Sequence, residues 1–130
     1  KKICEENNID FFAYSPLSFG ILCIDPDKEE NKEKSFIRNA LFENYKKPTY
    51  ELRKCLKRIA NQRSVSQAQV AINWCCYQGT IPLVGMRKKS QVIDVSNVFK
   101  WNLNKNEFKV LQEVSKNCLK KMPKNPFSSI

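Results

Sequence analysis

The stretch SQAQVAINWCCYQGTIPLVGMRKKS, residues 66–90, contains the pattern that decides the fold. Ser66 and Gln69 form a capping box, in which the hydroxyl accepts from an amide three residues on while Gln69 reaches back, so a helix is predicted to begin here. The helix is predicted to end at Gly79. The apolar run 81–85 that follows is typical of a short strand buried on both faces.

A second strand is predicted upstream of this stretch. Residues 9–14 are β-prone and end at Pro16, which cannot continue a ladder, so we expect another buried strand followed by a loop. The stretch 25–47 is charged and weakly periodic, which indicates a surface loop with one helical turn near residues 36–41.

Further helices complete the pattern. From Tyr50, apolar residues recur on one helical face, and Thr49 is placed to cap the first turn. Another helix begins near Ser90, and a capping box of Asn104 and Glu107 opens the last one. The positions expected to face inward are Val92, Val95 and Phe99 in the first of these two, and Phe108, Leu111, Val114, Cys118 and Leu119 in the second.

The order strand, two helices, strand, two helices implies parallel pairing with right-handed crossovers, and hence an α/β fold. At 130 residues the chain is too short for a complete eight-stranded β/α barrel, which needs roughly 200–250 residues. We therefore expect one incomplete domain over residues 1–130, should the sequence belong to that architecture.

Composition narrows the class of protein. The apolar fraction of 42% and charged fraction of 28% are ordinary for a globular protein. No apolar run approaches the ~20 residues needed to cross a bilayer, and the first residues lack the features of a signal peptide, so we expect a soluble, cytoplasmic protein without a membrane partner. Six cysteines without a Cys-x-x-Cys pair, and no histidine, argue against a metal site and favour reduced thiols.

The formal charge of +10 raises the question of an anionic partner. The lysines are spread over nearly every segment, and no arginine-rich stripe with interleaved aromatic residues is present. A solvated surface therefore accounts for the charge, and we expect no nucleic-acid partner.

Two loops follow the predicted strands, at the place where α/β proteins bind ligands. Residues 15–20 combine hydroxyls with a glycine, and residues 85–91 combine a glycine turn, three cations and a helix start. The partial positive charge of a helix start and the planar guanidinium of Arg87 both suit a phosphate. Either loop alone could equally be a plain turn.

Four ordered motifs make the sequence similar to the aldo-keto reductases over nearly its whole length. They are Cys4 and Ile9 followed by Ala13-Tyr14-Ser15-Pro16-Leu17 and Gly20; Gln69-Val70-Ala71-Ile72-Asn73-Trp74; Gln78-Gly79 with Ile81-Pro82 and Val84-Gly85; and Trp101, Leu103 and Glu107.

The resemblance implies the C-terminal portion of a (β/α)8 barrel, with the last two strands, from a family that uses NADP(H) to reduce aldehydes and ketones. By position, Tyr14 matches the residue that stacks on the nicotinamide, and Ser15, Pro16, Leu17 and Ser18 match the loop around the pyrophosphate. The adenosine and 2′-phosphate contacts are matched by Gly85, Arg87, Gln91 and Asp94, with Arg87 favouring NADPH over NADH.

Departures from the family pattern concern both cofactor and chemistry. Ile24-Asp25 stands where the family often has Gly-Lys, and Asp94-Val95 where it often has Glu-Asn. The family's catalytic Asp, Tyr, Lys and His lie on earlier strands, so no catalytic residue is assigned and the chain alone is expected to be inactive.

The chain is expected to associate with the rest of a barrel or with copies of itself, because two strands leave open edges.

Two other classes of function stay open at this point. The chain could be a basic helical module that binds nucleic acid or a protein partner, or a subunit-like protein that keeps part of the fold for interaction. The first would require its cations to gather on one face.

Overall fold

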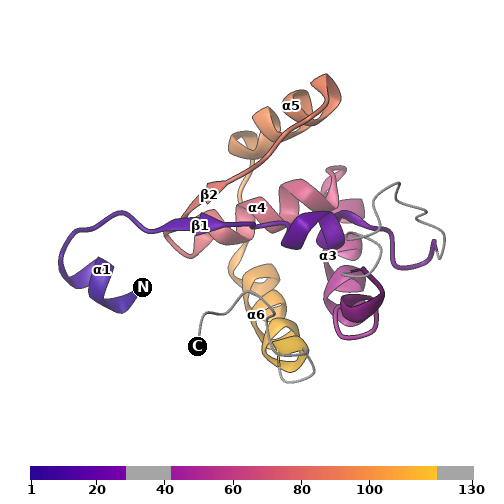
Figure 1. Ribbon diagram of the computed structural model, residues 1–130, viewed down its shortest axis with the longest axis horizontal. Coiled ribbons are helices and arrows are strands. Elements are labelled where there is room, and N and C mark those ends of the chain that lie inside the picture. The colour runs from indigo at the N-terminus through magenta and orange to yellow at the C-terminus, as the bar shows by residue number, and fades with distance from the viewer. Residues whose placement is uncertain (29–41, 120–130) are drawn as a thin grey trace.

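The computed structural model describes residues 1–28 and 42–119, and Figure 1 shows how their helices and strands are arranged. The predicted turn at residues 36–41 lies outside these ranges, as does the side chain of Leu119. The elements are α1 (Lys2–Glu6), β1 (Phe12–Tyr14), η1 (Ser18–Cys23), α3 (Tyr50–Arg63), α4 (Gln67–Tyr77), β2 (Ile81–Leu83), α5 (Lys89–Ser96), η2 (Asn97–Lys100) and α6 (Lys105–Leu119).

The predicted parallel pairing is confirmed. Within the described residues β1 and β2 form a two-stranded sheet, with Phe12 opposite Ile81 and Tyr14 opposite Leu83. The crossover between them contains α3 and α4, as an α/β fold requires. Because the strands are parallel, the loops after Tyr14 and Leu83 leave the sheet from the same edge.

The prediction that both strands are buried was wrong, and so were their lengths. The side chains of Phe12, Tyr14, Ile81 and Leu83 are 55%, 80%, 43% and 50% exposed. Only the alternate positions, such as Ala13, are half buried. The physical reason is that each strand has one neighbour among the described residues, whereas the apolar pattern is that of strands with neighbours on both edges and cover on both faces.

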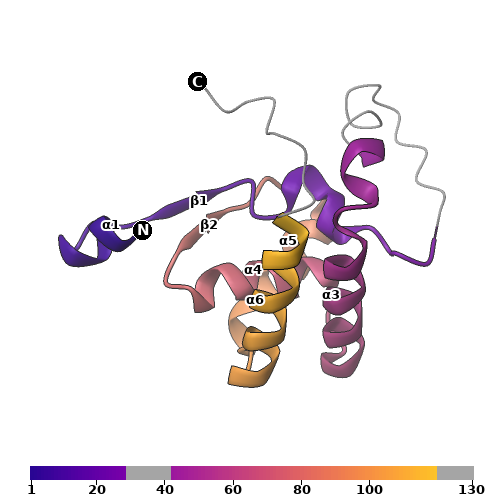
Figure 2. The same ribbon diagram turned by 90° about the horizontal axis from the view of Figure 1, so that it is seen from below.

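The core lies between α3, α4 and α6, which pack side by side in Figure 2. Leu56, Val70 and Leu111 are fully buried there. The side chain of Asn73 fastens the segment that leads into α6, since it donates to the carbonyl of Trp101 (2.8 Å) and accepts from the amide of Leu103 (3.1 Å). The predicted inward face of α6 is confirmed at Leu111 and Cys118.

The helix ends follow the sequence signals closely. The Ser66 hydroxyl accepts from the Gln69 amide (3.1 Å), and Gly79 has the left-handed φ of +70° that follows a helix end. Asn104 and Glu107 cap each other as predicted, because each side chain accepts from the other's amide, at 2.8 and 2.9 Å.

Three local predictions were wrong. Residues 42–46, expected to be loop, are helical. Thr49 therefore continues a turn and does not cap α3: its hydroxyl donates to the carbonyl of Tyr45 (2.6 Å). Gln69 does not reach back to Ser66, because its side chain is held by residues far along the chain.

The expected inner face of α5 was wrong at two of its three positions. Val92 is 50% and Phe99 84% exposed, Val95 is half buried, and Val98 in η2 is buried. The helix ends at Ser96 and changes to a 3-10 helix, which shifts the later residues away from the predicted face.

No helix among the described residues is both long and apolar enough to span a bilayer.

Candidate functional site

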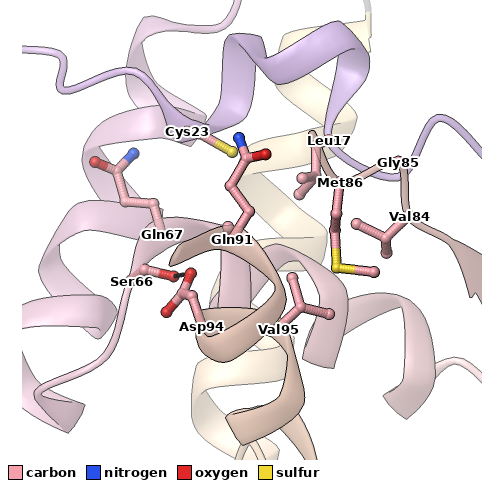
Figure 3. A pocket seen from close by; sticks show the side chains of 11 residues that line it. Leu17, Cys23, Ser66, Gln67, Val84, Gly85, Met86, Gln91, Asp94 and Val95 are labelled. Atoms are coloured by element: carbon pink, nitrogen blue, oxygen red, sulfur yellow. Dashed lines mark hydrogen bonds between the residues drawn. The ribbon is translucent and has the colours of Figure 1, made fainter. Parts of the chain in front are cut away.

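A cavity of about 260 Å³ lies where the loops after β1 and β2 meet the first turn of α4 (Figure 3). Its lining is mixed, with apolar side chains beside amides, a hydroxyl and a carboxylate. The volume is below the roughly 300–1,000 Å³ of sites that enclose a whole drug-sized ligand, so it suits one end of a larger molecule. The lining residues are Leu17, Cys23, Ser66, Gln67, Ala68, Val84, Gly85, Met86, Gln91, Asp94 and Val95.

The first loop has an unusual backbone. Ser15, Ser18 and Phe19 have positive φ values of 52°, 47° and 56°, and Gly20 follows at 92°. A left-handed conformation costs a non-glycine residue roughly 1–2 kcal/mol, and such residues gather at ligand sites. The turn is closed by backbone bonds, including Ser18 amide to Ser15 carbonyl at 2.9 Å.

The second loop is organised by Gln91. Its side-chain oxygen accepts from the amides of Arg87 (2.8 Å) and Lys88 (3.0 Å), which closes the turn before α5. The Arg87 side chain is exposed at this turn. Gln91 thus already satisfies the amides of Arg87 and Lys88, and the exposed guanidinium of Arg87 has the planar donors that suit an anion.

Asp94 joins α5 to α4. Its carboxylate accepts from the Ser66 hydroxyl (2.6 Å), the bond drawn in Figure 3, and from the Gln69 amide group (2.6 Å). Gln69 in turn accepts from the indole N–H of Trp101 (3.1 Å). A continuous chain of hydrogen bonds therefore runs from the end of η2 through α4 to α5.

The structure brings some of the predicted site residues together in the cavity wall: Leu17, Gly85, Gln91 and Asp94. Tyr14, Ser15, Pro16, Ser18 and Arg87 are not in the wall. They belong to the same two parts of the chain, which we call the first rim segment (residues 14–24, from the end of β1 through η1) and the second rim segment (residues 84–95, from the end of β2 into α5). The two begin side by side, since Tyr14 pairs with Leu83 at the end of the sheet. The predicted loops therefore share one cleft and do not lie on opposite sides of the molecule.

Sequence reasoning missed the contribution of α4 to the cavity. Ser66, Gln67 and Ala68 form part of the wall, yet the sequence indicated only a helix start there. A helix start inside the crossover between two parallel strands can itself lie near the ligand edge, and this signal could have included Ser66 among the candidates.

Metal ligands and nucleophiles are the other kinds of group that could form a site. In the ranges 1–28 and 42–119 no three His, Cys, Asp or Glu side chains are grouped as metal ligands would be.

A cysteine thiol is the nucleophile to consider. Burial, with a smaller effect of Cys76, raises the pKa of the Cys75 thiol to about 11. That thiol is protonated at neutral pH and is a structural residue of α4.

Comparison with known proteins gives consistent results. The model of the aldo/keto reductase family matches residues 1–116. A chloroplastic pyridoxal reductase of Arabidopsis thaliana is 33% identical over 99% of this chain and 35% of its own length. A putative aryl-alcohol dehydrogenase of Schizosaccharomyces pombe is 26% identical over 85% of this chain and 34% of its own.

A solved structure extends the comparison to the fold. The glycerol dehydrogenase of Gluconobacter oxydans superimposes with a TM-score of 0.66 and 27% identity, over 98% of this chain and 40% of that one. The chain thus spans about a third of the length of the curated relatives it matches, and its fold is part of a (β/α)8 barrel. The chain belongs to the aldo/keto reductase family.

Proposed function

We propose that the protein is an oxidoreductase that transfers hydride between NADP(H) and a small aldehyde, ketone or alcohol. The observation that carries the proposal is the shared cavity: the chain after each of two adjacent parallel strands, at Leu17 and at Gly85, lines one cleft at the ligand edge of the sheet. Family membership supports the class of reaction.

The cofactor is proposed to lie along both rim segments. We propose that the exposed ring of Tyr14 stacks on the nicotinamide, and that Ser15, Pro16, Leu17 and Ser18 surround the pyrophosphate. The cavity takes the adenosine end, beside the residues Gly85, Arg87, Gln91 and Asp94. Arg87 carries the preference for NADPH, because an exposed guanidinium offers a planar pair of donors to a 2′-phosphate.

The bound cofactor supplies the hydride, and this chain's own residues supply binding and orientation. We assign no catalytic residue in residues 1–130, and we propose that proton transfer to the substrate needs groups on other strands of the barrel. The chain alone is therefore expected to be inactive. It is proposed to associate with the rest of the barrel, or with a second copy, through the exposed sheet, and to act in the cytoplasm.

The test is titration of the complete protein with NADPH and with NADH, followed by protein fluorescence. Arg87→Ala is expected to weaken NADPH binding about 10- to 100-fold, the range for losing charge-assisted hydrogen bonds, and to leave NADH binding within about twofold. The matched control is Arg58→Ala, which removes an exposed arginine from α3, away from the cavity.

Two outcomes contradict parts of this proposal. An unchanged preference for NADPH in Arg87→Ala removes that residue from the 2′-phosphate role. Failure of the wild-type protein to bind either dinucleotide overturns the proposed function itself.

A further inference from the structure

We propose that the first turn of α4 is a positioning device that sets the spacing between the two rim segments, with Gln67 holding one and Ser66 and Gln69 holding the other. The inference rests on the proposed function, since the segments it positions are those assigned to the dinucleotide. Residues 66–69 would thereby determine cofactor affinity, although Gln69 is not in the cavity wall.

Gln67 holds the first rim segment. Its side-chain amide donates to the carbonyls of Leu22 (3.1 Å) and Ile24 (3.4 Å), at the end of η1. These acceptors are 45 and 43 residues away in the sequence, so the bonds are tertiary contacts that fix η1 against α4. Leu22 is also buried in the core, which adds an apolar contact to the same attachment.

Ser66 and Gln69 hold the second rim segment through Asp94. Each donates to a different carboxylate oxygen, both at 2.6 Å, so the orientation of the carboxylate and of α5 is fixed. Hydrogen bonds to a charged acceptor are among the stronger ones and resist rearrangement. Gln69 is 5% exposed, and its side-chain oxygen is held by Trp101, so it has no freedom to turn toward a ligand.

Both attachments start from the same turn, residues 66–69 at the start of α4. The geometry of that turn therefore sets the distance between the two rim segments. A dinucleotide that contacts both rim segments needs them at a fixed distance, and displacements of about 1 Å are enough to lose much of the binding or rate. Asp94 acts here by positioning α5, in addition to lying in the cavity wall. If Asp94 acts by positioning α5, exchanging the carboxylate and the amide between positions 94 and 69 should restore affinity. If Asp94 acts only by direct contact with the cofactor, the exchange should restore nothing.

The experiment exchanges the carboxylate of Asp94 and the amide of Gln69 between the two positions in the complete protein. The quantities measured are the NADPH affinity, KM and kcat. Gln69→Glu places two carboxylates in contact, and is expected to raise the KM for NADPH about tenfold with kcat within about twofold. Asp94→Asn leaves one acceptor oxygen where the carboxylate had two, so Ser66 and Gln69 can no longer each donate to an oxygen of their own, and binding is expected to weaken by a similar factor.

The double variant Gln69→Glu/Asp94→Asn restores the bond between positions 69 and 94 with donor and acceptor exchanged. The carboxylate introduced at position 69 would accept from the new amide and from Trp101, while the remaining oxygen at position 94 would still accept from Ser66. NADPH affinity is expected to recover at least about threefold relative to Asp94→Asn alone, a coupling typical of residues in one network. The matched control is Gln112→Glu, which removes a bond from α6 to Gln78 (3.2 Å) and should leave affinity unchanged.

Two results overturn the inference while leaving the proposed function intact. One is wild-type affinity in Gln69→Glu. The other is a double variant as weak as Asp94→Asn alone, which would mean that position 94 acts only through contact of its carboxylate with the cofactor and not through its bond to Gln69. Absence of dinucleotide binding by the wild-type protein is a separate outcome, which removes the proposed function and the inference with it.

Discussion

The helical part of the molecule and its sheet differ in how deeply they bury the same kind of apolar side chain. Between α3, α4 and α6, Leu56 is completely buried, whereas Leu83 in β2 is 50% exposed. The two side chains are chemically identical, so the difference lies in their surroundings. Among the described residues the helices pack against one another, whereas each strand pairs with one other strand.

This difference shows what each region contributes. The helical core makes a stable support, and the sheet edge carries the rim segments that line the cavity. Relatives of this chain are about three times as long, and in a closed barrel each strand has two neighbours. In such a barrel, neighbouring strands and helices would cover the apolar residues that are exposed on this sheet.

The largest effect is expected from truncation in the core. Leu56→Ala should lower the free energy of unfolding by about 3 kcal/mol, because a cavity forms among fully buried side chains. Leu83→Ala should cost less than about 1 kcal/mol, because half of that side chain is already in water. Urea unfolding measures both, and equal losses would contradict the contrast between the two regions.

The exposed sheet is expected to cause self-association of the 130-residue chain. Ile81→Lys places a charge on it and should raise the dimer dissociation constant by about tenfold or more, because like charges would meet in an apolar contact. Tyr50→Lys, at an exposed aromatic of α3, is the control. Sedimentation velocity over a range of concentrations is the measurement, and a wild-type chain that stays monomeric throughout would contradict the expectation.

A smaller effect within the helical region comes from the pair Arg63–Glu107, at 2.8 Å between α3 and α6. Burial acts to raise the pKa of Glu107, but the bonds from Arg63 and the Asn104 amide outweigh it and hold that pKa below its usual value. Glu107→Gln should cost about 1 kcal/mol at pH 7.

The pH dependence of that loss follows from the lowered pKa. The stabilisation is present above the unfolded pKa of about 4.3 and is lost as pH falls through the folded value, so variant and wild type should converge in acid. Glu113→Gln, an exposed position on the same helix, should show no such dependence. A loss that persists at about pH 2–3, below the usual carboxyl range, would mean that the charge of Glu107 is not its source.

The smallest effect on stability is expected at Gly85, in the second rim segment. A Cβ at Gly85 would meet no atom within 4 Å, so Gly85→Ala should change the free energy of unfolding by no more than about 0.5 kcal/mol. The added methyl group would lie at the cavity wall, and NADPH affinity should fall even though stability does not. A parallel loss of both would indicate that Gly85 has a structural role.

What the sequence predicted well depends on short-range signals. The start of α4 at Ser66, its end at Gly79 and the capping box at Asn104 each rest on residues within a few positions of one another. The parallel pairing of the two strands also followed from local patterns and their order.

What it missed depends on partners far along the chain. The side chain of Gln69 was expected to cap its own helix but bonds to Asp94 and Trp101, 25 and 32 residues away. The exposure of Phe12 and Leu83 could not be predicted from strand propensity, because burial is decided by what packs around a strand. The role of α4 in the cavity wall has the same origin.

The central claim is that both rim segments bind one dinucleotide with an extra ribose phosphate. The direct measurement is a crystal structure of the complete protein with NADPH. The account predicts the nicotinamide against Tyr14, the adenosine end in the cavity beside Gly85, and the 2′-phosphate within hydrogen-bond distance of Arg87. A cofactor that contacts only one rim segment, or a 2′-phosphate held by residues other than Arg87, would contradict it.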